Sequence, residues 1–189
     1  MKKVKIGVDF DGVIANTGEL QKHITKELFG KNISPSCHYS TSVRERNLTK
    51  DEARIVFNET YQNQKYLSTL KEQPNAKKTL MNLVNSGIPL EIITSREEKE
   101  FDFAQKWLKQ NGIYIPMKSI SNEKDKIKAC NGLDIYVEDI PYQIDLLKKI
   151  VPRIVLFNSY DNKESVLTKE ERKQVEGIER ISDWNQFKI

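Results

Sequence analysis

A strand followed at once by two carboxylates is predicted from Val4-Lys5-Ile6-Gly7-Val8-Asp9-Phe10-Asp11-Gly12. The first half of this segment is rich in β-branched residues, which favour a buried strand. Asp9 and Asp11 follow two positions apart, and Gly12 permits a sharp turn of the chain behind them. The segment therefore indicates a sheet in which the end of the first strand carries acidic side chains.

Short apolar runs alternate with segments of helical period from residue 76 onward. Gly87 and Asn111-Gly112 supply stop signals at the ends of two of the helical segments. This alternation predicts an α/β fold, a doubly wound parallel sheet with helices on both faces. The further strands are expected at residues 90–93, 117–120, 135–137 and 154–157, and the helices at 76–84, 97–110, 124–130 and 141–150.

The segment between the first two strands departs from this alternation. Residues 17–29 place Leu20, Ile24 and Leu28 at a four-residue period, which indicates a helix. Thr49-Lys50-Asp51-Glu52 has the pattern of a capping box and predicts the start of a second helix. No strand is expected between them, so the first strand is followed by a helical insertion.

The composition argues against several classes of protein. The 189 residues suit one domain, and 31 Lys and Arg against 27 Asp and Glu give a formal net charge of +4. The basic residues are scattered, whereas a nucleic-acid binder gathers them in a stripe or tail. Cys37 and Cys130 are too few for a disulfide framework; one bridge between them is an alternative, and two buried free thiols are the simpler expectation. The chain shows neither a signal peptide nor a membrane span, so we expect a cytoplasmic protein without nucleic-acid or membrane partners.

Polar side chains also follow the other predicted strands. Thr94-Ser95-Arg96 follows the second strand, Lys124 lies beyond the third, and Glu138-Asp139 follows the fourth. Because ligands bind outside the carboxyl ends of the strands in a parallel sheet, these residues are expected to form one site with the carboxylates of the first strand. Residues of these types handle phosphate or a divalent cation.

Up to four carboxylates would meet at this site, two from the first strand and two from the fourth. They would repel one another unless a cation lay among them, and Mg²⁺ is the hard ion best suited to oxygen ligands. The ion would also let a phosphate dianion approach. One carboxylate could then attack phosphorus while the other protonates the leaving oxygen. Lys124 and the hydroxyls of Thr94 and Ser95 would offset charge on the transferring group.

Four segments in order resemble the motifs of the haloacid dehalogenase superfamily. The segment Val8-Asp9-Phe10-Asp11-Gly12-Val13-Ile14-Ala15-Asn16-Thr17 closely resembles the first motif, and Ile92-Ile93-Thr94-Ser95-Arg96 is similar to the second. Lys124 is similar to the third motif and Val137-Glu138-Asp139 to the fourth. The resemblance extends from residue 1 to about residue 160.

This resemblance implies a Rossmann-like core with a small helical cap inserted after the first strand. The core would comprise residues 1–16 and 72–189, and the cap residues 17–71. The compact cap and the pairs Thr94-Ser95 and Glu138-Asp139 are most similar to the branch that contains 5′-nucleotidases. Two departures from that branch concern the choice of nucleotide: Asn16 stands where Asp is common, and Arg96 where some nucleotidases have Pro.

The resemblance also implies a role for each acidic residue. Asp9 would be the nucleophile and a Mg²⁺ ligand, and Asp11 the general acid and base, with its backbone carbonyl on Mg²⁺. Asp139 would be the remaining protein ligand, with Glu138 next to the ligands rather than among them. Dehalogenases of the superfamily lack the second Asp of the first motif, so Asp11 favours phosphoryl transfer.

Thr94, Ser95 and one lysine would bind the substrate phosphate. The lysine would also orient Asp9. Lys126 and Lys128 are rivals for this role, and the spacing of fourteen residues before Glu138 favours Lys124.

The implied activity is Mg²⁺-dependent hydrolysis of a small phosphate monoester through an aspartyl phosphate on Asp9. A nucleoside monophosphate is the candidate substrate, and a monomer or homodimer the expected assembly. Two alternatives remain: a phosphotransferase or phosphomutase with the same intermediate, and a receiver-like phosphate-binding module without turnover.

Substrate selection is expected to depend on the cap. Arg96 either contacts substrate or caps the next helix, and Asp161 and Asn162 either lie near the site or form a turn. Candidate specificity residues in the cap are His23, His38, Tyr39, Arg44, Arg46 and Tyr61.

Overall fold

The computed structural model describes residues 3–35 and 48–189 of the chain. These residues form a six-stranded sheet with the order β3-β2-β1-β4-β5-β6, and every neighbouring pair is parallel. The predicted doubly wound parallel sheet is therefore confirmed. The strands are β1 (Ile6–Val8), β2 (Leu90–Thr94), β3 (Met117–Ser119), β4 (Ile135–Glu138), β5 (Arg153–Phe157) and β6 (Glu179–Ile181).

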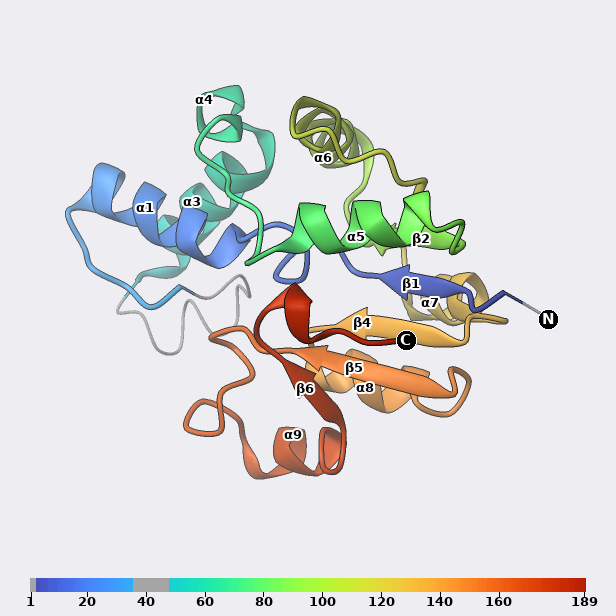
Figure 1. Cartoon of the computed structure of the whole chain (residues 1–189). Helices are drawn as coiled ribbons and strands as arrows, with labels where there is room; N and C mark the ends of the chain where they lie inside the picture. Colours follow the sequence, from blue (N-terminus) through green and yellow to red (C-terminus); the bar gives the residue numbers. More distant parts are fainter. Residues whose placement is uncertain (1–2, 36–47) are drawn as a thin grey trace.

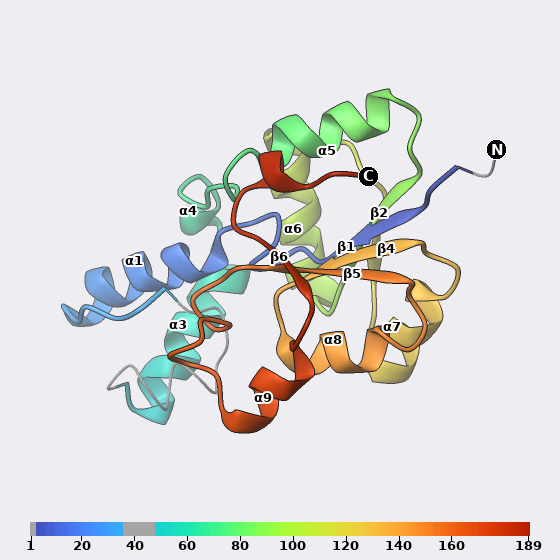
Figure 2. The ribbon, with the colours of Figure 1, turned by 60° about the horizontal axis from the view of Figure 1, so that its bottom comes forward.

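Helices cover both faces of the sheet. In Figures 1 and 2, α5 and α6 lie on one face, and α7, α8 and α9 on the other. Their bounds are α5 (Ala76–Asn85), α6 (Glu98–Gln110), α7 (Glu123–Cys130), α8 (Pro141–Leu147) and α9 (Lys169–Gln174), and a 3₁₀ turn follows at Trp184–Gln186.

Alternation along β5 shows why the sheet needs two covering layers. Ile154 and Leu156 belong to one buried cluster, whereas Val155 and Phe157 belong to the other. Since successive side chains of a strand point to opposite faces, both faces of the sheet are apolar and must be covered. The helical patterns that alternate with the strands in the sequence supply that cover.

Strand β6 was not predicted from the sequence. It has three residues, Glu-Arg-Ile, of which the first two are exposed. A short edge strand with charged side chains is hard to recognise from hydropathy, although such charges protect an edge from further pairing.

The predicted insertion contains α1 (Thr17–Phe29), α3 (Lys50–Gln62) and α4 (Gln64–Leu67). The capping box predicted at Thr49 is present, and Asn16 caps α1 by accepting a hydrogen bond from the backbone N–H of Glu19. Figure 1 shows these helices beyond the carboxyl end of β1.

Chain segments that enter and leave the insertion lie side by side. The backbone N–H of Asn16 donates to the carbonyl of Lys71 at 2.8 Å, and that of Gln73 donates to Ile14 at 2.7 Å. A bridge between Ala15 and Glu72 joins the same two segments. The connection to the sheet is therefore a narrow two-stranded neck.

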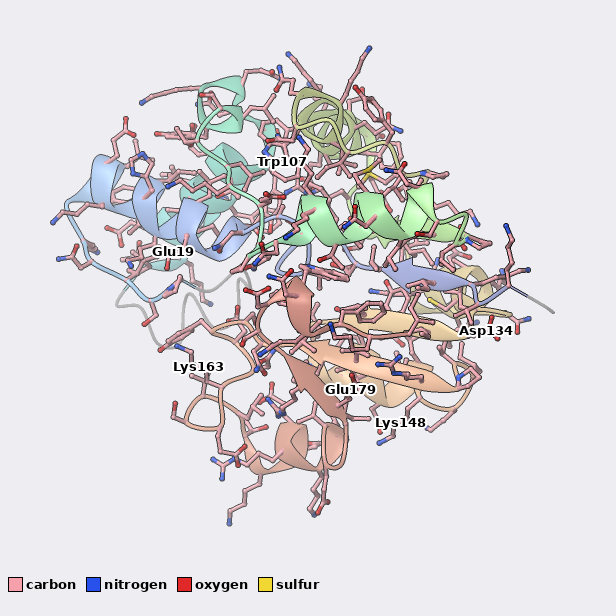
Figure 3. All side chains as sticks on the ribbon, in the orientation of Figure 1. Glu19, Trp107, Asp134, Lys148, Lys163 and Glu179 are labelled. Atoms are coloured by element: carbon pink, nitrogen blue, oxygen red, sulfur yellow. The ribbon has the colours of Figure 1, made fainter. Side chains whose placement is uncertain are left out.

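The insertion packs against α6 of the rest of the chain. Trp107, labelled in Figure 3 between α4 and α6, donates its indole N–H to the carbonyl of Leu70 at 2.9 Å. Its ring meets Phe10 edge to face, with centroids 5.6 Å apart. One buried tryptophan thus links the insertion, α6 and the loop after β1.

Two expectations from the composition concern membrane-spanning segments and the two cysteines. No helix in the described part of the chain is long and apolar enough to cross a membrane. Cys130 is buried, and burial raises the pKa of its thiol to about 12. Cys37 lies outside the described residues.

Candidate active site

The loop after β1 brings Asp9 and Asp11 to the edge of the sheet. The backbone N–H of Asp9 donates to the carbonyl of Val137 at 3.0 Å, so the pairing of β1 with β4 continues to this residue. Gly12 then adopts a φ of +75°, which favours glycine. A Cβ on Gly12 would lie 2.1 Å from Oδ2 of Asp139. Glycine is thus required both for the turn and for the close approach of a carboxylate.

Long-range hydrogen bonds hold this loop. Gln73 donates its side-chain amide to the carbonyl of Gly12 at 2.8 Å, and Trp184 donates its indole N–H to the carbonyl of Val13 at 2.9 Å. The hydroxyl of Thr17 accepts from the backbone N–H of Gly12 at 3.2 Å. Segments far apart in the sequence therefore fix the position of the two carboxylates.

Asp9, Glu138 and Asp139 form a buried acidic cluster whose ligand atoms lie within 4.8 Å of one another. Burial raises the pKa of Asp9 from 3.8 to about 8; the charge of Lys126 opposes this shift, and those of Glu138 and Asp11 add to it. Burial, followed by the charge of Glu138, also raises the pKa of Asp139 well above its usual range. So much buried negative charge in one place fits a divalent cation with oxygen ligands.

Lys126 is the cation beside Asp9. Its Nζ lies 3.3 Å from Oδ1 of Asp9 and 2.6 Å from Oε2 of Glu138. The side chain is 4% exposed, and burial is the largest single influence on its pKa and lowers it. The charges of Glu138, Tyr136 and Asp9 and the hydrogen bond to Glu138 together outweigh burial and hold the pKa well above 10.5. Lys126 is therefore charged and forms a bridge between the two carboxylates.

This geometry favours Lys126 over Lys124, which the spacing had favoured, as the lysine of the third motif. Lys124 and Lys128 are exposed, and neither contacts Asp9. Residues two apart on a helix point about 200° away from each other, so only one of Lys124 and Lys126 can face the sheet. Helix α7 buries Lys126 and Cys130, which are four residues apart and so lie on one face of the helix. This periodicity indicates that Lys126 faces the sheet, and the distance in sequence from Glu138 does not.

Both carboxylate oxygens of Glu138 are engaged. Oε2 accepts from Lys126, while Oε1 accepts from the backbone N–H groups of Asp139 at 3.0 Å and Ile140 at 3.2 Å. Glu138 therefore holds Lys126 and the turn that carries Asp139.

Thr94 and Ser95 stand at the end of β2 as expected. Thr94 is buried and its hydroxyl accepts from the backbone N–H of Arg96 at 3.2 Å, whereas Ser95 is exposed at the rim. Arg96 is turned inward and pairs with Asp11 through two hydrogen bonds of 2.8 and 2.7 Å.

A cavity of about 220 Å³ is lined by residues of this site and by residues of the insertion. A larger hollow of about 650 Å³ adjoins it and shares Ser95, Lys126 and Gln143; exposed Lys124 lines this second space. The first cavity is lined by Asp9, Asp11, Phe57, Tyr61, Ser95, Arg96, Glu100, Lys126, Asp139, Ile140 and Gln143.

Residues 2–188 match the model of a family described as "5' nucleotidase, deoxy (Pyrimidine), cytosolic type C protein". The chain belongs to this nucleotidase family. It is accordingly an enzyme that hydrolyses phosphoric monoesters, and its membership confirms the resemblance to 5′-nucleotidases.

Two curated proteins are similar to this nucleotidase-family chain over most of their length. One, from Oceanobacillus iheyensis, is named "Putative nucleotidase OB0422" and is 23% identical over 195 residues, covering 97% of each chain. The other, from Chlorobaculum tepidum, is named "Putative 5'(3')-deoxyribonucleotidase" and is 29% identical over 153 residues, covering 77% of this chain and 74% of the relative.

The fold agrees with that of a solved haloacid dehalogenase-like protein. The hydrolase SP0104 from Streptococcus pneumoniae superposes with a TM-score of 0.63 at 14% identity, over 94% of this chain and 93% of that chain.

Of the cap residues proposed to select the substrate, Tyr61 reaches the cavity of this nucleotidase-family enzyme. His23 does not line the cavity; it lies 3.7 Å from Glu27 on the surface of α1. Phe57 lines the cavity beside Tyr61 but was not a candidate, although its spacing of four residues from Tyr61 on one helix was a usable signal. The remaining candidates, His38, Tyr39, Arg44 and Arg46, lie outside the described residues.

Asp161 and Asn162 lie in a turn, as one of the two interpretations expected, and the Asn162 side chain is buried beneath the site. It is fully buried, and its amide donates to the carbonyl of Asp139 at 2.9 Å and to that of Phe157 at 2.8 Å. Its oxygen accepts from the backbone N–H of Ser159 at 3.2 Å. Asp161 is close enough for its charge to contribute to the raised pKa of Asp139. The loop after β5 thus supports the turn that carries Asp139.

Proposed function

We propose that this chain is a Mg²⁺-dependent 5′-nucleotidase that forms an aspartyl phosphate on Asp9. The observation that carries the proposal is the position of Asp9, buried in an acidic cluster with Lys126 at 3.3 Å, in a member of a nucleotidase family. Asp9 and Asp11 both line a cavity of about 220 Å³ at the sheet edge, which supports their proposed roles as nucleophile and as acid and base.

The reaction has two steps. An oxygen of Asp9 attacks phosphorus while the bond to the ester oxygen breaks, and Asp11 gives a proton to that oxygen as it leaves. Asp11 then takes a proton from a water molecule, whose oxygen attacks the phosphorus of the aspartyl phosphate. Inorganic phosphate leaves, and Asp9 is restored as a carboxylate.

The acidic cluster would hold the metal through the side chains of Asp9 and Asp139 and the backbone carbonyl of Asp11. Gly12 leaves room for the Asp139 carboxylate, and Asn162 fixes the backbone of Asp139. When bound, Mg²⁺ would offset the negative charge that Asp9, Asp139 and the phosphate bring together.

Lys126 would orient Asp9 and bind the phosphate, together with Thr94 and Ser95. An ammonium group already fixed against Asp9 needs no rearrangement when charge develops on the phosphoryl oxygens, which is the arrangement that stabilises such a transition state.

Residues 17–71 would act as the cap that selects the substrate. Phe57 and Tyr61 of α3 line the cavity, with ring centroids 4.4 Å apart, and offer apolar ring surface next to the reacting groups. Such surface suits the base of a nucleoside monophosphate. The names of the family and of the Chlorobaculum tepidum relative favour a deoxyribonucleotide.

Removal of divalent ions is expected to lower phosphate release by about 100-fold or more, because the carboxylates of the cluster would then repel the substrate dianion. The measurement is release of phosphate from p-nitrophenyl phosphate, nucleoside 5′- and 3′-monophosphates and sugar phosphates, with Mg²⁺ or with EDTA. Mg²⁺ should restore the rate and raise the melting temperature.

Unchanged turnover in EDTA would contradict the metal dependence. A sugar acceptor that receives the phosphoryl group in place of water would identify a phosphotransferase. A folded protein that binds Mg²⁺ but turns over no compound would favour the phosphate-binding module.

A further inference from the structure

Arg96 is a buried arginine at the edge of the catalytic cavity. Its Nε donates to Oδ2 of Asp11 at 2.8 Å and its Nη2 to Oδ1 at 2.7 Å, so the guanidinium grips both carboxylate oxygens. Such a two-point bond fixes the plane of the carboxylate as well as its position. The Arg96 side chain is 2% exposed, whereas that of Asp11 is 19% exposed and opens onto the cavity.

Three aromatic rings surround the guanidinium. Its Cζ lies 4.9 Å from the ring centroid of Phe10, 5.8 Å from that of Phe103 and 4.5 Å from that of Tyr61. Phe10 lies between the two acidic residues of the first motif, Phe103 belongs to α6, and Tyr61 belongs to α3 of the insertion. One ring of the clamp therefore comes from the segment proposed as the cap.

The backbone of Arg96 is fixed as well. Its N–H donates to the hydroxyl of Thr94 at 3.2 Å, and its carbonyl accepts from the hydroxyl of Ser119 at 2.8 Å. The backbone hydrogen bonds and the three rings together restrict the movement of the guanidinium. They also restrict the Asp11 carboxylate that it binds.

Stability alone is a weak reason for this arrangement. A buried ion pair gains little net free energy, because desolvation offsets the attraction. Moreover, Nη1 of Arg96 has no hydrogen-bond partner among the described residues. The guanidinium of Arg96 binds the one carboxylate that the proposed reaction uses as acid and base, that of Asp11. Orientation of this carboxylate therefore explains the arrangement better than stability does.

We propose that Arg96 is a positioning residue that orients Asp11 for proton transfer, and that Tyr61 completes its clamp when the insertion is docked on α6. This inference rests on the proposed role of Asp11. It adds a link from α3 to the reacting groups, through Tyr61, Arg96 and Asp11 in turn.

The consequence is a dependence on the leaving group. A nucleoside 5′-oxygen needs a proton as it leaves, whereas p-nitrophenolate leaves readily without one. Loss of Arg96 should therefore slow the first step for a nucleotide and spare it for the aryl ester. The ratio kcat/KM reports this step, because it covers only the events up to departure of the leaving group, whereas the later hydrolysis of the aspartyl phosphate affects kcat alone.

The test compares deoxyuridine 5′-monophosphate with p-nitrophenyl phosphate, both with Mg²⁺. For Arg96→Met, kcat/KM is expected to fall about 10- to 100-fold for the nucleotide and less than about threefold for the aryl ester. Arg96→Lys keeps the positive charge but loses the two-point bond to the carboxylate. Its kcat/KM for the nucleotide should therefore lie between those of Arg96→Met and the wild type. Arg54→Met, at an exposed arginine on α3 that also pairs with an aspartate, Asp51 at 3.1 Å, is the matched control and should change neither value.

A second comparison uses the double variant Asp11→Asn/Arg96→Met. If Arg96 acts only through Asp11, the double variant should be no slower on the nucleotide than Asp11→Asn alone. Losses that multiply would overturn the proposal, as would an equal loss on the two substrates in Arg96→Met, because both would show that Arg96 acts on the phosphate or on the fold.

Tyr61 keeps the proposal testable if the Arg96 variants fail to fold. Because Tyr61 also lines the cavity proposed for the base, its variant is compared on two esters that have no base: Tyr61→Leu should lower kcat/KM for deoxyribose 5-phosphate more than for p-nitrophenyl phosphate. An unchanged ratio of these two values in Tyr61→Leu would overturn the link to the insertion. Failure of the proposed function gives a different result: Asp11→Asn would then lose activity equally on both substrates, or not at all.

Discussion

Asp9→Asn is expected to reduce phosphate release by about 10⁴-fold or more, the size of loss that follows removal of a covalent nucleophile. Asparagine fills the same space as aspartate, but its neutral amide does not form an acyl phosphate. The measurement is phosphate release with Mg²⁺, together with acid quenching of the wild type, in which the peptide that contains Asp9 should carry the phosphoryl group. Asp102→Asn, an exposed aspartate on α6, is the matched control and should keep the wild-type rate.

The same variant should fold at least as well as the wild type in EDTA. A carboxyl group whose pKa rises from 3.8 to about 8 on folding binds its proton more tightly in the folded state. The wild type therefore loses stability as the pH rises from the lower to the higher value, and asparagine removes this loss. Thermal melting at pH 6 and pH 8 measures both effects. Wild-type turnover by a folded Asp9→Asn protein would exclude Asp9 as the nucleophile.

The sheet could be predicted from the sequence because its strands are buried on both faces. Ile92-Ile93 and Ile154-Val155 are apolar without interruption, as strands between two helical layers must be, and glycine marks the ends of the intervening helices. The acidic groups could be placed for the same reason: they follow directly after strands, so strand position fixes theirs. The positions of Asp9 and Asp139 could therefore be predicted without knowledge of tertiary contacts.

The parts that sequence reasoning missed depend on which way a side chain points. Arg96 lies three residues after a predicted strand, yet nothing local shows that it turns inward to Asp11, because Phe10 and Tyr61 are each distant from it in the sequence. Asn162 likewise binds the backbone of Asp139 across 23 residues. Such partners arise only when separate elements pack.

The sequence also contained a signal that favours Lys126 as the lysine of the third motif. Lys126 shares a helix face with Cys130, and a buried cysteine marks the side of α7 that faces the sheet. Periodicity along the helix was thus a better guide than linear distance from Glu138, because residues two apart on a helix are on opposite sides.

Lys126→Met is expected to lower kcat by about 10²- to 10³-fold, whereas Lys124→Met should stay within about threefold of the wild type. Lys126 bridges Asp9 and Glu138, while Lys124 is exposed on the other side of α7. Steady-state kinetics of the two variants on one nucleotide decide between the two lysines. The opposite order of losses would restore the preference that spacing suggested.

Stability must be separated from catalysis in this comparison. Without Lys126, Glu138 is a fully buried carboxylate that has lost its cation, which costs about 3–5 kcal/mol of folding free energy. Adding Glu138→Gln removes that charge, so Lys126→Met/Glu138→Gln should melt closer to the wild type than Lys126→Met does. Its rate should stay low, because no ammonium group then lies beside Asp9. Recovery of the rate together with stability would show instead that Lys126 serves the fold, and that Asp9 reaches its reactive state without a neighbouring cation.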